Sequence, residues 1–132
     1  MDKKIAVILY GQYRVFDIAV KSWYFRFHLD CDFYVSTWRK TVFNPINSKN
    51  EPYEVTVTED MFLKHLPNAK VSIHDEEHFI FDKTKMKCSD LIPSKMIFHM
   101  KHGLKMINDN NIKYDYLLIT RPDIFLFFLN IK

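Results

Sequence analysis

A short, uninterrupted apolar run near the N-terminus constrains the fold more than any other feature of this sequence. Residues 3–10 read KKIAVILY, and Gly11 ends the run. A continuous apolar run of this length, bounded by a turn residue, is typical of a strand that is buried on both faces, as in a parallel sheet. Parallel strands need long crossover connections, which are usually helices. The rest of the chain should therefore alternate helices with strands.

The segments that follow fit this expectation. Over residues 15–29 apolar side chains recur every three or four positions, which predicts an amphipathic helix. Residues 32–37 (DFYVST) are rich in aromatic and β-branched side chains and predict a second strand. Strand, helix and strand together form one β-α-β unit. Residues 38–57 contain two prolines and several asparagines, which predict a long surface loop.

The middle of the chain continues the alternation. Thr58 is a suitable N-cap for a short helix that Pro67 ends, and residues 69–74 predict a third strand. After a charged loop, Pro93 suits the first turn of a helix that extends to about residue 108.

Two more apolar runs lie near the C-terminus. Residues 114–120 (YDYLLIT) and 124–129 (IFLFFL) predict two further strands, separated by Arg121, Pro122 and Asp123. The complete order predicts an α/β fold with a mostly parallel sheet flanked by helices. The length of 132 residues fits a single domain over residues 1–132.

Composition excludes several classes of protein. A hydrophobic content of 48% and an aromatic content of 16% exclude a disordered chain. Gly11 and Gly103 are the only glycines, so the chain cannot contain the glycine-rich loops of dinucleotide-binding or P-loop proteins. The net charge of +3 is small and both signs are scattered, which does not indicate a nucleic-acid partner.

Cysteine usage and apolar run length bear on the cellular compartment. Cys31 and Cys88 do not form a CxxC pair, which fits a reduced cytoplasmic compartment. The N-terminal apolar run is too short for a secretory signal, and no stretch approaches the roughly 20 apolar residues of a membrane-spanning helix. We therefore expect a cytoplasmic protein without a membrane span.

Polar residues follow the first predicted strand directly. Ligands of open parallel sheets bind beyond the carboxyl ends of the strands. Gly11 would let a ligand approach the backbone, Gln12 can both donate and accept hydrogen bonds, and Arg14 offers a planar fork suited to phosphate. A tight turn followed by two solvated side chains explains the same residues equally well.

Residues from three other segments reach the same edge. Asp123 follows the strand over residues 114–120 and is a candidate oxygen ligand for Mn²⁺ or Mg²⁺, although a turn aspartate paired with Arg121 is the simpler interpretation of the tripeptide. Trp38 would either stack on a base or cap the sheet. Ser94 and Lys95 face this edge if their helix runs antiparallel to the strands, where a helix N-terminus favours an anion.

Three motifs occur in a fixed order along the chain: AVILYGQYR at residues 6–14, DFYVSTW at 32–38 and YDYLLITRPD at 114–123. Together they resemble small GT-A-type glycosyltransferases of viruses, phages and bacteria, whose strands carry GQxR, DxxxxTW and YDxxxxxRxD patterns. The resemblance implies a Rossmann-like, GT-A-type core that binds a nucleotide diphosphate sugar such as a UDP-sugar. If the protein is viral, it implies the host cytoplasm as the location.

The resemblance also implies roles for single residues. Gly11, Gln12 and Arg14 would hold the nucleotide, and Asp123 would bind Mn²⁺ or Mg²⁺ as the last acid of a DxD motif. Arg121 stands where the first acid of that motif usually lies. One carboxylate would then hold the metal with help from the diphosphate, whose charge Arg121 would offset. No residue can be assigned as a catalytic base or nucleophile.

The resemblance covers the donor half of such an enzyme. Nine residues follow Asp123, whereas GT-A enzymes ordinarily continue with the segments that bind the acceptor. We therefore expect a donor-binding core that transfers or hydrolyses the sugar, without an acceptor-binding half. The alternative is a non-catalytic nucleotide-binding or accessory domain that acts through a partner or as a homodimer, with the apolar run at 124–129 as an uncovered edge.

Overall fold

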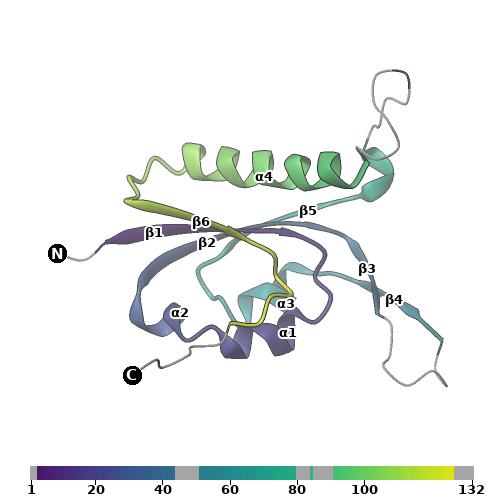
Figure 1. Cartoon of the computed structure of the whole chain (residues 1–132), viewed down its shortest axis with the longest axis horizontal. Helices are drawn as coiled ribbons and strands as arrows, with labels where there is room; N and C mark the ends of the chain where they lie inside the picture. Colours follow the sequence, from purple (N-terminus) through teal and green to yellow (C-terminus); the bar gives the residue numbers. More distant parts are fainter. Residues whose placement is uncertain (1–2, 44–50, 80–83, 85–90, 127–132) are drawn as a thin grey trace.

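The computed structural model describes residues 3–43, 51–79, 84 and 91–126 (Figure 1). Four strands form one sheet in the order β5-β2-β1-β6, and every neighbouring pair is parallel. The strands are β1 (Lys4–Gly11), β2 (Asp30–Trp38), β5 (Lys70–His74) and β6 (Tyr116–Thr120). The prediction of a mostly parallel sheet in an α/β fold is confirmed.

Helices cover both faces of this sheet (Figure 1). The long helix α4 (Leu91–Asp109) lies on one face, and the short helices α1 (Phe16–Ala19), η1 (Val20–Ser22), α2 (Phe25–His28) and α3 (Glu59–Leu63) lie on the other. Another short helix, η2 (Glu76–His78), follows β5. Among the described residues, no helix has both the length and the apolar character needed to cross a membrane.

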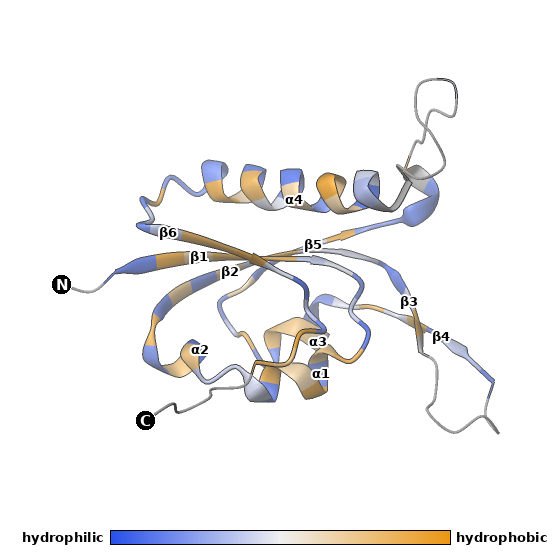
Figure 2. Cartoon of the chain, viewed as in Figure 1, coloured by the Kyte–Doolittle hydropathy of each residue, from blue (hydrophilic) through white to orange (hydrophobic). Residues whose placement is uncertain are grey.

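Strand β1 lies inside the sheet and is buried on both of its faces. Val7 and Leu9 pack into the core beneath the short helices, whereas Ala6 and Ile8 pack toward α4. All four side chains are at most 1% exposed. Figure 2 shows this hydrophobic stretch lying between the two helical layers. Burial on both faces explains why the run over residues 3–10 is apolar without alternation.

The single helix predicted over residues 15–29 is wrong. The segment forms three short helices, and the chain leaves the helical conformation at Trp23 (φ −89°, ψ 72°). The Ser22 hydroxyl donates to the carbonyl of Ala19 at 2.6 Å, a contact by which serine competes with the regular backbone ladder. The Trp23 indole donates to the carbonyl of Ile124 at 2.6 Å, so tertiary contacts hold the break.

The surface loop predicted over residues 38–57 is also wrong in part. Strands β3 (Lys40–Phe43) and β4 (Tyr53–Thr56) pair antiparallel within it, and an ion pair of 3.3 Å joins Lys40 to Glu54 across them. Each strand has only four residues, too few to show a clear alternation in the sequence.

The last predicted strand, over residues 124–129, is not present in the part of this segment that the structure describes. Residues 124–126 are not in a strand, and residues 127–129 lie outside the described part. Pro122 interrupts the ladder after β6, and the backbone N–H of Leu126 donates instead to the Ser22 hydroxyl at 2.9 Å. Within the described residues β6 is therefore an edge strand, and Leu117 and Leu118 are 46% and 42% exposed.

A substitution at Gly103 would test how closely α4 packs on β1. A Cβ added at Gly103 would lie 2.6 Å from Cγ2 of Ile8, well inside van der Waals contact. We expect Gly103→Val to lower the free energy of unfolding by about 2 kcal/mol, because overpacking a core costs about 1–3 kcal/mol. Urea denaturation measures this loss.

Lys105→Val is the matched control. Lys105 is exposed on the same helix, so this variant places the same β-branched side chain in α4 without touching β1. Equal losses of stability in the two variants would contradict the close contact between Gly103 and Ile8.

Candidate functional site

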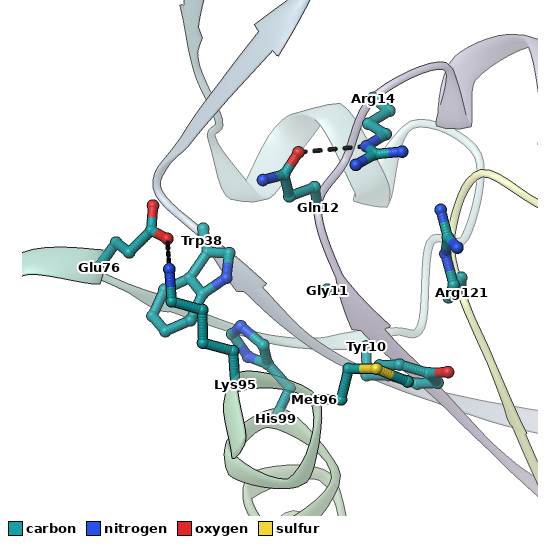
Figure 3. Close-up of a pocket in the computed structure, with 10 residues that line it drawn as sticks. All are labelled: Tyr10, Gly11, Gln12, Arg14, Trp38, Glu76, Lys95, Met96, His99 and Arg121. Atoms are coloured by element: carbon teal, nitrogen blue, oxygen red, sulfur yellow. Dashed lines mark hydrogen bonds and ion pairs between the residues drawn. The ribbon is translucent and has the colours of Figure 1, made fainter. Parts of the chain in front are cut away.

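A cavity of about 280 Å³ opens at the carboxyl edge of the sheet, where α4 begins (Figure 3). The register pairs Gly11 of β1 with Thr37 of β2, and the Thr37 hydroxyl donates to the Gly11 carbonyl at 2.6 Å. The ends of these strands are thereby tied together. The cavity is lined by Tyr10, Gly11, Gln12, Arg14, Trp38, Glu76, Lys95, Met96, His99 and Arg121.

Most of the residues that the sequence predicts to bind the ligand line this cavity. Gly11, Gln12, Arg14, Trp38, Lys95 and Arg121 line it, whereas Ser94 and Asp123 do not. Helix α4 runs antiparallel to the strands, as the expectation for Lys95 required (Figure 1). The structure therefore brings residues from both ends of the chain to one place.

The turn after β1 has an unusual backbone. Gly11 has φ +104°, which glycine adopts without strain, and Arg14 has φ +43°, which is uncommon for a residue with a side chain. The backbone N–H of Arg14 contacts the hydroxyl of Thr41 in β3 at 3.4 Å. Such conformations persist only where surrounding contacts hold them, and they cluster at ligand sites.

Arg14 and Arg121, here called the arginine pair, share one carboxylate. Arg121 donates from Nε to Asp123 Oδ1 at 3.0 Å and from Nη2 to Oδ2 at 2.6 Å. Arg14 Nη1 lies 3.7 Å from the same Oδ2, and Arg14 Nε donates to Gln12 Oε1 at 3.1 Å. The Asp123 side chain is 11% exposed, against 52% for Arg14 and 44% for Arg121. The simpler interpretation of the tripeptide, an aspartate paired with Arg121, matches this geometry.

This arrangement does not fit a divalent cation at Asp123. Both carboxylate oxygens already accept hydrogen bonds from Arg121. Across the part of the chain that the structure describes, no three His, Cys, Asp or Glu side chains come together as a metal site. A metal would have to share these oxygens with the Arg121 guanidinium, and the metal role of Asp123 stays a prediction.

Positive charge predominates around the cavity. Arg14, Arg121 and Lys95 line it, together with a single carboxylate, that of Glu76. Lys95 forms an ion pair with Glu76 on one side of the cavity (Figure 3). The two guanidinium groups of the arginine pair share the single negative charge of Asp123, which leaves one surplus positive charge. A site with this charge favours an anionic ligand.

The floor of the cavity is largely aromatic, with one buried polar side chain, that of His99. Trp38 is only 3% exposed and stacks on Phe98 of α4, with ring centroids 5.4 Å apart and an interplanar angle of 11°. His99 meets the Trp38 ring edge-to-face at 4.2 Å. This packing agrees with Trp38 as a cap on the sheet and leaves little of its surface for stacking on a base.

His99 is a buried polar group at this floor. Its Nδ1 lies 2.7 Å from the hydroxyl of Ser36, and its buried Nε2 has no hydrogen-bond partner among the described residues. Burial, and to a smaller extent the neighbouring His74 and His102, lower the pKa of His99 to about 3. The imidazole is therefore neutral at pH 7.

Four lining residues escaped the sequence analysis: Tyr10, Glu76, Met96 and His99. Two signals were available. Glu76 follows the third strand, whose carboxyl end reaches the same edge as the others. His99 is four positions after Lys95, a spacing that places both on one face of a helix. Nothing in the sequence separates Met96 from the ordinary core residues of α4.

Two histidines between α4 and the sheet, His99 of α4 and His74 of β5, predict that the stability of the protein depends on pH. Burial lowers the pKa of His74 and His99 below the unfolded value of 6.5, so the unfolded chain binds more protons below that pH. We expect the free energy of unfolding to fall as the pH drops from 6.5 toward 4. His99 alone would contribute a slope of up to about 1.4 kcal/mol per pH unit.

Urea denaturation at several pH values measures this slope. His99→Gln should flatten it, because glutamine does not titrate, whereas substitution of the exposed His28 by Gln serves as the control. An identical slope in wild type and His99→Gln would show that His99 is not held neutral by the fold.

The chain was also compared with known proteins. No family model, curated protein sequence or solved structure gives a significant match. The functional assignment therefore depends on the residues at the cavity and on the resemblance carried by the three sequence motifs.

Proposed function

We propose that the cavity binds the nucleoside diphosphate part of a nucleotide sugar. On this proposal the protein is a GT-A-type glycosyltransferase, or its donor-binding core, with a Rossmann-like fold. One observation carries it: Gly11, Gln12 and Arg14 meet Arg121 at a single cavity although more than a hundred positions separate them in sequence. These are the residues to which the motif resemblance assigns the donor.

The chemistry of the walls supports this ligand. The arginine pair supplies planar N–H donors suited to phosphate oxygens, and the backbone at Gly11 allows close approach. The largely aromatic floor suits the less polar nucleoside. The volume of about 280 Å³ is near the lower end of the roughly 300–1,000 Å³ typical of ligand pockets, so the sugar would extend toward the opening.

The same groups would assist sugar transfer. As the oxygen of water or of an acceptor hydroxyl bonds to the anomeric carbon and gives up its proton to solvent, the bond to the diphosphate oxygen breaks and its electron pair leaves with the nucleoside diphosphate. Arg14 and Arg121 would stabilise the negative charge that develops there. The resemblance also implies Mn²⁺ or Mg²⁺, whose chemistry at such a site is charge neutralisation. The pairing of Asp123 with Arg121 does not fit that role.

A second candidate is a non-catalytic nucleotide-binding or accessory domain. The observation that favours it is β6, an edge strand among the residues that the structure describes, where Leu117 and Leu118 are 46% and 42% exposed. Such an edge is open to a partner protein or to a second copy of the chain. Hydrolysis of a nucleotide sugar by the monomeric protein would exclude this candidate.

Nucleotide binding tests the proposal directly. We expect UDP-glucose, or another nucleotide sugar from a panel that varies base and sugar, to raise the Tm, because a ligand of the native state stabilises it by mass action. Arg14→Gln should weaken binding about tenfold or more, since hydrogen bonds to charged groups contribute about 1.5–3 kcal/mol. Calorimetry measures the Kd.

Arg39→Gln is the control for lost positive charge. Arg39 is 45% exposed, forms its own ion pair with Asp75 at 2.6 Å, and does not line this cavity. It should bind as the wild type does. The proposal is wrong if no nucleotide or nucleotide sugar binds at millimolar concentration, with or without Mn²⁺.

A further inference from the structure

We infer that this site holds a diphosphate without a divalent cation, through the arginine pair that Asp123 positions. The inference rests on the proposed function and names the chemistry of its phosphate subsite. It departs from the metal role implied for Asp123 by the resemblance. The argument comes from how the three side chains are paired, buried and charged.

Asp123 is fully engaged in orienting guanidinium groups. Its two oxygens accept the paired N–H donors of Arg121, and Oδ2 also faces Arg14 at 3.7 Å. A bidentate arginine–carboxylate pair is geometrically specific as well as strong. Asp123 therefore acts as a positioning residue, which fixes the direction of both guanidinium groups.

Because Arg14 and Arg121 are more exposed than Asp123, a ligand in the cavity would contact the two guanidinium groups and not the carboxylate. Arg14 and Arg121 line the cavity and have about half of their side-chain surface exposed, whereas Asp123 is 11% exposed and does not line it. Figure 3 shows both arginines along one side of the cavity, opposite Lys95 and Glu76. An incoming anion would meet N–H donors first.

Electrostatics oppose a metal in this position. A divalent cation bound to Asp123 would lie within a few ångströms of two guanidinium groups, and like charges at that separation repel strongly. It would also compete with Arg121 for the two carboxylate oxygens. A diphosphate anion instead complements the surplus positive charge and leaves the pairing of Arg121 with Asp123 in place.

The turn that carries Arg14 is already organised for this role. Arg14 keeps a left-handed backbone (φ +43°) that the contact with Thr41 helps to hold, and its Nε is bonded to Gln12. Arg121 is followed by Pro122, which is buried and has a fixed φ. Groups that are ordered before binding lose less entropy when the ligand arrives.

Inorganic pyrophosphate is the probe that tests this subsite independently of any base or sugar. Calorimetry at low ionic strength compares wild type, Arg121→Gln and Arg39→Gln, each in excess EDTA and each with Mn²⁺. In EDTA we expect wild type to bind pyrophosphate more tightly than orthophosphate. Arg121→Gln should weaken pyrophosphate binding about 10- to 100-fold, the range expected for charge-assisted hydrogen bonds. Arg39→Gln, matched in exposure and pairing, should match wild type.

Asp123→Asn separates positioning from metal binding. It keeps the shape of the side chain but removes the charge that orients the arginine pair. We expect it to reduce the preference for pyrophosphate over orthophosphate several-fold in EDTA, with a modest fall in Tm, because the Asp123 side chain is 11% exposed and the substitution weakens its pairing with Arg121. A metal role would instead appear as a response to Mn²⁺ that is present in wild type and absent in Asp123→Asn.

The outcomes distinguish this inference from the proposed function. Binding of pyrophosphate or UDP that is lost in EDTA and restored by Mn²⁺ would overturn the inference, as would equal affinity of wild type and Arg121→Gln. The proposed function survives the first of these results, because UDP would still bind. If pyrophosphate binds without metal and depends on Arg121 while no nucleoside diphosphate binds, the diphosphate subsite stands and the proposed function is wrong.

Discussion

The rest of the structure depends on the burial of β1 on both faces. Val7 and Leu9 face one helical layer and Ala6 and Ile8 face the other, all at most 1% exposed. Because β1 also pairs with a parallel strand on each side, its neighbours β2 and β6 must end at the same edge as it does. The site is a consequence of this arrangement, since Gly11, Trp38 and Arg121 each lie at or just beyond the end of one of these strands.

Positively charged side chains outnumber carboxylates at that edge of the sheet. Three cations and one carboxylate line the cavity, and Asp123 lies behind two of the cations. The Asp123 carboxylate does not neutralise the arginine pair, because its one negative charge is shared between two guanidinium groups. It orients both groups and leaves a net positive charge toward the opening. The neutral His99 at the floor adds no charge of its own at pH 7.

Several elements were predictable because their pattern is local. The buried strands, the long helix α4 and the convergence of their ends follow from apolar periodicity and from the rule for ligand sites in parallel sheets. The break at Trp23 was not predictable, since it depends on a hydrogen bond to Ile124 about a hundred positions away. The β3–β4 pair was missed because each strand is short and its charged residues pair only after folding. Residues 124–126 read as a strand by composition, but Ser22 and Trp23 bind their backbone instead.

The chain's residues alone were enough to establish an α/β fold with a parallel sheet, because continuous apolar runs alternating with helical periods have few other ways to be buried. They also identified Gly11, Gln12, Arg14, Trp38, Lys95 and Arg121 as residues of one edge. The state of Asp123 was decided only in three dimensions. The pairing of Asp123 with Arg121 is local and was one of the two interpretations of the tripeptide, but the second guanidinium, that of Arg14, reaches the same carboxylate only because β1 and β6 lie side by side.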